Sequence, residues 1–183
     1  MLILASKSPR RRELLSIITK DFRIIPAVGE ERADRSLPPD KYVCELARHK
    51  AQEIAAQYPE DTVIGADTVV AVNGEILGKP KDEADAKRML RLLSGTEHHV
   101  YTGVCIISKK ENAEFAEDTK VRFFTLSDKE IDDYTATGEP FDKAGGYGIQ
   151  DRGALLVSGI TGDYYNVMGL PVGRLARELK NMY

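Results

Sequence analysis

Apolar runs and amphipathic stretches alternate along the chain and predict its secondary structure. Short runs of β-branched and aliphatic residues indicate strands, whereas apolar residues spaced three and four apart indicate helices. The predicted strands are residues 2–5, 22–26, 62–72, 75–77, 98–108, 116–126 and 155–160. The predicted helices are residues 9–19, 39–58 and 82–93, a short one from 128, and one after Pro171. Because strands and helices interleave, we expect a mixed α/β sheet.

Turn and capping residues support several of these boundaries. Ser8-Pro9 places a capping hydroxyl before a proline at the first helical position. Asn73-Gly74 is the dipeptide expected of a tight hairpin turn. Ser127 and Glu130 have the spacing of a capping box. These signals mark two helix starts and one hairpin.

Composition and charge limit the classes of protein to be considered. The chain has 183 residues, of which 42% are hydrophobic and 30% charged, so we expect one domain over residues 1–183, with at most an attached lobe. Its 26 basic and 29 acidic residues give a net charge of −3, so no overall field favours long nucleic acids or anionic membranes. An anionic ligand must therefore be bound by local charges.

Export or membrane insertion is not expected from the sequence. The apolar residues after Met1 precede the basic run Arg10-Arg11-Arg12, which reverses the order of a secretory signal. No apolar stretch is long enough to cross a bilayer. Cys44 and Cys105 are the only cysteines and lack metal-ligand spacing, so we interpret them as reduced thiols. We therefore expect a cytoplasmic protein.

Two arginines in the first predicted helix break its amphipathic pattern. The core face is predicted to hold Leu14, Leu15, Ile17 and Ile18, and the helical period places Arg10 and Arg11 on that face, with Arg12 outside. Guanidinium groups near a helix N-terminus, together with the hydroxyl donors of Ser6 and Ser8, describe a phosphate-binding site. The alternative, surface salt bridges to Glu13, Glu30 or Glu31, stays open.

Lys50 interrupts the apolar stripe of the second long helix. The stripe comprises Val43, Leu46, Ala47, Ala51, Ile54, Ala55 and Tyr58. A lysine on this face needs an anionic partner or a route by which its ammonium group reaches water. The pattern does not decide between these two interpretations.

Asp67 and Thr68 interrupt the most apolar predicted strand. A carboxylate at the end of a buried strand is typical of metal ligands and general bases, although Asp67 could instead cap a turn. Glu30 and Glu31, on an irregular charged segment, are candidates for a second carboxylate ligand of a hard cation such as Mg²⁺. For Glu30 we prefer an interpretation as a solvated loop charge.

Two loops offer further candidate binding groups. Gly78-Lys79-Pro80 places a lysine directly after the predicted hairpin, and the glycines of residues 142–150 allow close approach to a ligand. Gln150 has both a donor and an acceptor, as needed to read the edge of a base. His98 and His99 lie on a strand without ligand spacing and are interpreted as structural.

Four segments, taken together and in order, closely resemble the Maf family. They are Ser6-Lys7-Ser8-Pro9-Arg10-Arg11-Arg12-Glu13-Leu14-Leu15, Gly65-Ala66-Asp67-Thr68-Val69-Val70, Gly78-Lys79-Pro80 and Asp142-Lys143-Ala144-Gly145-Gly146-Tyr147-Gly148-Ile149-Gln150. The resemblance covers essentially the whole chain. It implies an elongated mixed β-sheet flanked by helices, similar to the inosine triphosphate pyrophosphatase fold, with a substrate cleft between two lobes. It also implies a homodimer.

The resemblance further implies a nucleoside triphosphate pyrophosphatase with defined site residues. Asp67 matches the proton acceptor of the family. The implied phosphate-binding residues are Ser6, Arg11, Lys50 and Lys79, and the implied metal ligands are Glu31 and Asp67, for Mg²⁺, Mn²⁺ or Co²⁺. Arg10, Thr68 and Gln150 match the branch that acts on dTTP and UTP, and CTP or modified pyrimidine nucleotides are further candidate substrates.

The expected reaction is attack on the α-phosphate by water activated by Asp67, which releases a nucleoside monophosphate and pyrophosphate. Cationic side chains and a divalent metal would neutralise the triphosphate. The alternative is a non-catalytic nucleotide sensor that acts on cell division and septum formation through a protein partner. A nucleic-acid-binding module is disfavoured because no basic patch interleaved with aromatic residues is present.

Overall fold

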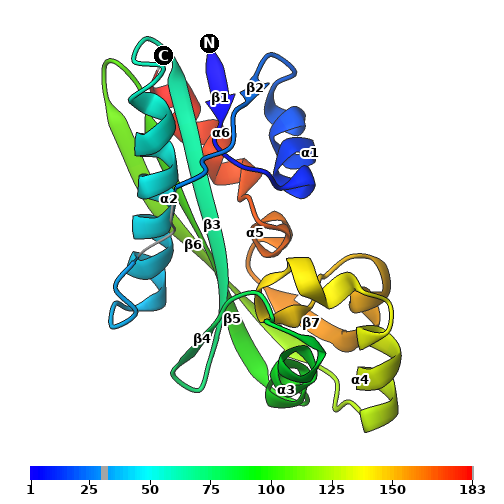
Figure 1. The fold of residues 1–183 in the computed structure, drawn as a ribbon. Coiled ribbons are helices and arrows are strands. Elements are labelled where there is room, and N and C mark those ends of the chain that lie inside the picture. Colours follow the sequence, from blue (N-terminus) through cyan, green and yellow to red (C-terminus); the bar gives the residue numbers. More distant parts are fainter. Residues whose placement is uncertain (30–32, 183) are drawn as a thin grey trace. The chain divides into compact units, whose positions relative to one another are not determined.

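A seven-stranded sheet runs through the chain in this computed structural model, which describes residues 1–29 and 33–182 (Figure 1). Its strands are β1 (Leu2–Leu4), β2 (Arg23–Ile24), β3 (Thr62–Val72), β4 (Glu75–Leu77), β5 (Glu97–Ile107), β6 (Asn112–Phe123) and β7 (Val157–Thr161). The strand order is β2-β1-β3-β5-β6-β7, and β4 pairs with β3. Strand β1 pairs in parallel with β2 and β3, whereas the β3–β4 and β6–β7 pairs are antiparallel. The predicted mixed sheet is confirmed.

Helices lie between these strands and after the last one, as the sequence predicts. The α-helices are α1 (Pro9–Ile18), α2 (Pro39–Ala55), α3 (Glu83–Leu93), α4 (Asp128–Thr135), α5 (Tyr164–Met168) and α6 (Val172–Asn181). Three 3₁₀ segments are η1 (Glu139–Asp142), η2 (Ala144–Gly146) and η3 (Asp151–Leu156). The capping box is present, since the Ser127 hydroxyl accepts from the Glu130 N–H and the Glu130 carboxylate accepts from the Ser127 N–H. The hairpin turn has the positive φ angles that Asn73-Gly74 permits, 50° and 81°.

Several predicted boundaries are wrong. Helix α2 ends at Ala55 rather than near Tyr58, β2 is confined to Arg23–Ile24, and β6 begins at Asn112 rather than at Ala116. Helix α5 and the 3₁₀ segments were not predicted. The core face of α1 is also smaller than predicted, because Ile17 is 61% exposed. None of the helices in the described residues is long and apolar enough to span a membrane.

The described chain divides into two compact units. Unit 1 comprises residues 1–67, 102–117 and 169–183, and unit 2 comprises residues 68–101 and 118–168. The boundary crosses β3 between Asp67 and Thr68, so these adjacent residues belong to different units. Each unit has its own buried cluster of apolar side chains.

In unit 1, helix α2 packs against one face of the sheet. The cluster there consists of Ile3, Ala5, Ala47, Ala51, Ile54, Val63 and Cys105. Two glycines let the helix backbone approach the strands closely: a Cβ atom at Gly65 would lie 2.2 Å from the Ala47 carbonyl oxygen, and one at Gly103 would lie 2.4 Å from that of Val43. Any larger residue at these positions would force the helix away from the sheet.

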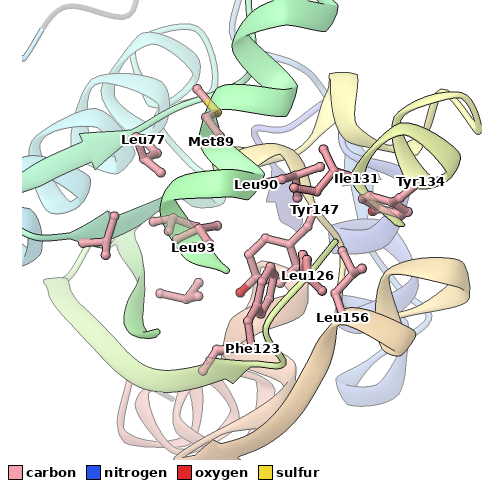
Figure 2. Close-up of a cluster of buried hydrophobic side chains, with 14 residues drawn as sticks. Leu77, Met89, Leu90, Leu93, Phe123, Leu126, Ile131, Tyr134, Tyr147 and Leu156 are labelled. Atoms are coloured by element: carbon pink, nitrogen blue, oxygen red, sulfur yellow. The ribbon is translucent and has the colours of Figure 1, made fainter. Parts of the chain in front are cut away.

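In unit 2, helices α3 and α4 and residues of the glycine-rich segment enclose an apolar cluster (Figure 2). Leu90, Leu93, Phe123, Ile131 and Tyr147 lie at its centre, each at most 4% exposed. His98 lies beside this cluster and is fully buried, with its ring edge-on to those of Phe123 and Tyr147. This core fixes the segment between α4 and β7, which carries the glycines noted in the sequence.

Candidate active site

A half-buried ion pair joins two of the predicted site residues in unit 1. The Lys50 ammonium nitrogen donates to Asp67 Oδ1 at 2.5 Å, and the side chains are only 12% and 14% exposed. Of the two interpretations of Lys50, the anionic partner is therefore correct, and that partner is Asp67. Each of the two charges therefore has a partner of opposite sign.

The strand pattern explains why Asp67 faces Lys50. Side chains alternate between the two faces of a strand, so Val63, Gly65 and Asp67 share the face on which α2 packs. The missing side chain at Gly65 brings Ala47 and Ala51 of α2 against the strand. Lys50 lies on the same stretch of that helix, and its stem therefore reaches Asp67.

Asp67 does not stand at the end of its own strand, and this part of the prediction is wrong. Strand β3 continues without a break to Val72, so Asp67 is not a turn cap. The neighbouring strand β1 is shorter: its last residue, Leu4, pairs with Ile64. Asp67 therefore lies on the part of β3 that extends past the end of β1. After β1 the chain turns through Ser6 into α1. The carboxyl ends of parallel strands meet at one edge of a sheet, so Ser6 and Asp67 follow the same end of the β1–β3 pair.

Ser6 and Arg11 form a second group in unit 1. Ser6 is 7% exposed, and its hydroxyl accepts from the Ser8 N–H at 3.2 Å and from Arg11 Nη1 at 3.4 Å. Arg11 Nε donates to the Gly169 carbonyl oxygen at 2.8 Å. The guanidinium group is thereby held at the first turn of α1. The Ser8 hydroxyl accepts from the Arg11 N–H and so caps α1. A hydroxyl that accepts can also donate, so its donation to an anion stays a prediction.

The burial of the three arginines follows the predicted helix faces. Arg10 and Arg11 are half-buried, whereas Arg12 is exposed. Thr68, the residue after Asp67, is half-buried in unit 2 and by strand alternation points to the opposite face of β3 from Asp67.

Lys79 and Gln150 lie on connected loops of unit 2. Residues 142–150 are named the glycine loop. The Gly145 N–H of this loop donates to the Gly78 carbonyl oxygen at 3.0 Å. This bond links the glycine loop to the loop that carries the exposed Lys79. Gln150 is half-buried, and its side chain makes no capping hydrogen bond to the η3 segment that follows it. Its amide is therefore not used to cap the backbone.

Glu31, the second predicted metal ligand, lies outside the described residues, as does Glu30. Within residues 1–29 and 33–182, no three His, Cys, Asp or Glu side chains are grouped as a metal-binding cluster. Asp67 alone among the described candidates offers a half-buried carboxylate beside a cation. One protein carboxylate is compatible with Mg²⁺, which is commonly bound by one or two carboxylates together with substrate phosphates.

The sequence did not indicate the groups that hold the site residues in place. The Gly169 carbonyl orients Arg11, and Gly169 itself has a φ of 115°, in the region that favours glycine. The short run Gly169-Leu170-Pro171 was a visible turn signal, but nothing in it pointed to Arg11. Tyr134, which contacts the glycine loop, carried no signal because its position fits an ordinary core residue of α4.

Comparison with known proteins was consistent with the resemblance noted in the sequence. The family model described as Maf-like protein matches residues 1–182. Proteins named dTTP/UTP pyrophosphatase match at 52% identity in Geobacillus sp. (strain WCH70), over 99% of this chain and 97% of that protein, and at 54% in Carboxydothermus hydrogenoformans, over 97% and 96%. A third, from Bacillus cytotoxicus, is 52% identical over 97% of this chain and 93% of that protein.

Among solved structures, the Ham1 protein of Staphylococcus aureus matches with a TM-score of 0.58, over 100% of this chain and 99% of that one. At 14% sequence identity this likeness concerns the fold alone. It confirms the expected similarity to the inosine triphosphate pyrophosphatase fold.

Proposed function

Because the chain belongs to the Maf family over residues 1–182, we propose that it hydrolyses dTTP and UTP to the nucleoside monophosphate and pyrophosphate. Relatives that are about half identical over nearly the whole chain carry the name dTTP/UTP pyrophosphatase. The observation that carries the proposal for this chain is the half-buried Lys50–Asp67 ion pair. It provides a carboxylate and a cation in one place, as hydrolysis of an anionic substrate requires.

Asp67 is the proposed general base. Its carboxylate accepts a proton from water while the water oxygen forms a bond to the α-phosphorus. The bond from the α-phosphorus to the oxygen bridging to the β-phosphate breaks, and pyrophosphate leaves with the bonding electron pair. The Lys50 ammonium group donates to Asp67, and it can also donate to a phosphate oxygen.

Ser6 and Arg11 are proposed to bind substrate phosphate. Arg11 lies in the first turn of α1, where free backbone N–H groups and the helix dipole favour anions. Its hydrogen bonds to Ser6 and Gly169 hold the guanidinium group before substrate arrives, which reduces the entropy lost on binding. Lys79 is proposed as a further phosphate-binding residue.

Recognition of the base is proposed for Arg10, Thr68 and Gln150. A threonine hydroxyl and a glutamine amide can each donate and accept, which matches the carbonyl and N–H edge of thymine and uracil. A divalent cation, with Glu31 and Asp67 as the proposed ligands, would supply charge neutralisation at the phosphates when bound. A cytoplasmic homodimer stays a prediction, which light scattering of the purified protein and cell fractionation would test.

Pyrophosphate release from a panel of nucleoside triphosphates tests the function. With Mg²⁺, Mn²⁺ or Co²⁺ present, dTTP and UTP should be the preferred substrates, with CTP and modified pyrimidine nucleotides in the same panel. Replacing the general base in Asp67→Asn should lower kcat by about 10²–10⁴-fold while sparing most of the nucleotide affinity. A near-normal kcat for this variant would reject the role of Asp67. Nucleotide binding without any hydrolysis by the wild-type protein would favour the alternative of a regulator of septum formation.

A further inference from the structure

Three residues of unit 2 restrict Gly148 of the glycine loop: Tyr134, Lys143 and Gly153. The Gly148 N–H donates to the phenol oxygen of Tyr134 at 3.1 Å. The aliphatic stem of Lys143 covers its Cα, because a Cβ at Gly148 would lie 2.8 Å from Lys143 Cε. On the other side, a Cβ at Gly153 would lie 1.9 Å from the Gly148 carbonyl oxygen. Gly148 therefore has little room to move in any of these directions.

Tyr134 is itself rigidly placed. It is 3% exposed within the apolar cluster of unit 2 and lies on α4, whose N-terminus is fixed by the Ser127–Glu130 capping box. Burial raises the pKa of the Tyr134 hydroxyl, and the neighbouring Glu139 carboxylate adds to this effect. The hydroxyl therefore stays protonated and neutral at neutral pH. The acceptor for Gly148 is thus a fixed, uncharged oxygen on a core helix.

Further hydrogen bonds cross-link the rest of the loop. The Lys143 ammonium donates to the Glu139 carbonyl oxygen at 2.7 Å. A hydrogen bond of 2.7 Å joins the Tyr147 hydroxyl to His98 Nε2 in the core. The loop is therefore fixed immediately before Gly148 as well as at it.

The constraint at Gly148 extends to Gln150. Ile149, between them, is 8% exposed and so packs inward. Asp151, directly after Gln150, has a φ of 52°, in the left-handed region that aspartate adopts more readily than most non-glycine residues. Gln150 thus lies between a buried residue and a residue in a left-handed turn conformation, while its own amide makes no capping bond. Its backbone is fixed, and its side chain is the part left to interact with a ligand.

We propose that Tyr134 is a positioning residue for base selection: by accepting the hydrogen bond of Gly148, its hydroxyl fixes the loop that presents Gln150. This inference rests on the proposed function, in which Gln150 reads the pyrimidine. Tyr134 does not touch the reacting phosphate in this proposal. Its loss should therefore affect the choice and binding of the base much more than the chemical step.

Tyr134→Phe is the most direct test, because it removes one oxygen and keeps the ring in the core. Steady-state kinetics with dTTP, UTP and GTP should show a KM for the pyrimidine nucleotides raised about five- to tenfold, a kcat within about twofold of wild type, and a smaller kcat/KM ratio of UTP to GTP. Thr135→Val is the matched control. It removes a buried hydroxyl from the next residue of α4, one whose hydrogen bond among the described residues is to the Ile131 carbonyl of its own helix, and it should leave the ratio unchanged.

A double variant separates positioning from general loosening of the fold. If Tyr134 acts through Gln150, then Tyr134→Phe should cause little further loss of the UTP-to-GTP ratio in a Gln150→Ala background. Independent, additive losses would overturn the proposal. Should Tyr134→Phe fail to fold, Gly153→Ala provides the second variant, since its methyl group would displace the Gly148 carbonyl, and the same loss of selectivity is expected.

Different results would contradict the proposed function and the positioning role of Tyr134. A wild-type protein that releases pyrophosphate equally from UTP and GTP, or from neither, would contradict the proposed function. A selective wild-type protein whose selectivity falls in Gln150→Ala but survives in Tyr134→Phe would contradict the positioning role alone.

Discussion

Acid should destabilise unit 2 through its buried histidine. His98 is 0% exposed, its Nε2 shares a hydrogen bond with the Tyr147 hydroxyl, and its Nδ1 has no hydrogen-bond partner among the described residues. Burial lowers the pKa of His98 from 6.5 to about 4, with a smaller contribution from the neighbouring His99. The native state therefore holds this imidazole neutral at pH values where an unfolded chain would protonate it.

The sign and size of the effect follow from proton linkage. Because the folded pKa lies below the unfolded one, the unfolded state binds the extra proton, and stability falls as the pH drops from about 6.5 towards 4. For these two pKa values the loss between pH 8 and pH 5 is roughly 2 kcal/mol. In a chain of this size that corresponds to a decrease in Tm of about 4–8 °C. Carboxylates with lowered pKa values, such as Asp85, also make the free energy of unfolding fall at acidic pH, because the unfolded chain protonates them first.

His98→Gln isolates the histidine contribution, because glutamine keeps a polar group within reach of Tyr147 but does not titrate in this range. The variant should be less stable than wild type at pH 8, since glutamine does not replace the ring packing against Phe123. Its urea-derived free energy of unfolding should then fall less steeply between pH 8 and pH 5 by roughly 2 kcal/mol. Parallel curves for the two proteins would refute the reasoning.

Two further predictions concern unit 1. Lys50→Met removes the cation paired with the Asp67 carboxylate and should lower kcat/KM for UTP by more than about tenfold. Lys41→Met, at an exposed position of the same helix, should have little effect. Equal activity of the two variants would contradict a functional role for the ion pair. Burial raises the pKa of Cys44 to about 11 and that of Cys105 to about 12, so both thiols should react slowly with a disulfide reagent at pH 8 in the native protein and rapidly in guanidinium chloride. Fast stoichiometric labelling of the native chain would show that the thiols are accessible.

Elements with local chemical signals were the ones that could be predicted from the sequence. The serine caps of α1 and α4 and the Asn73-Gly74 turn involve residues close together in the chain, and all three are present. The start of β6 depends instead on distant residues. Its polar first part is held by ion pairs such as Arg48–Glu114, between α2 and β6, and a polar segment of this kind has no strand pattern of its own.

Helix α5 illustrates the same limit. Its five residues are too few to show a helical period, and they are anchored by Asn166, whose amide nitrogen donates to the Val100 carbonyl and to the Thr119 hydroxyl. These partners lie far away in the sequence. No local pattern could have indicated them.

Only part of the candidate site could be predicted from the sequence. The sequence showed that Lys50 and Asp67 each interrupt an apolar pattern. They meet because Asp67 points to the face of β3 on which α2 packs, and because Gly65 lets α2 approach that face closely. The contact of Arg11 with Gly169 joins the first helix to the C-terminal part of the chain and could come only from the three-dimensional structure. Glu31 stays a prediction.

The close approach of α2 to the sheet limits how this protein can be engineered. Replacing glycine by alanine is a common route to greater thermostability, because it narrows the range of conformations open to the unfolded chain. At Gly65 and Gly103 the added methyl groups would push α2 away from the sheet and move Lys50 away from Asp67. Any stability gained from the less flexible unfolded chain would then be accompanied by a lower kcat. Gly173, inside α6, has room for a methyl group and is the better place to begin.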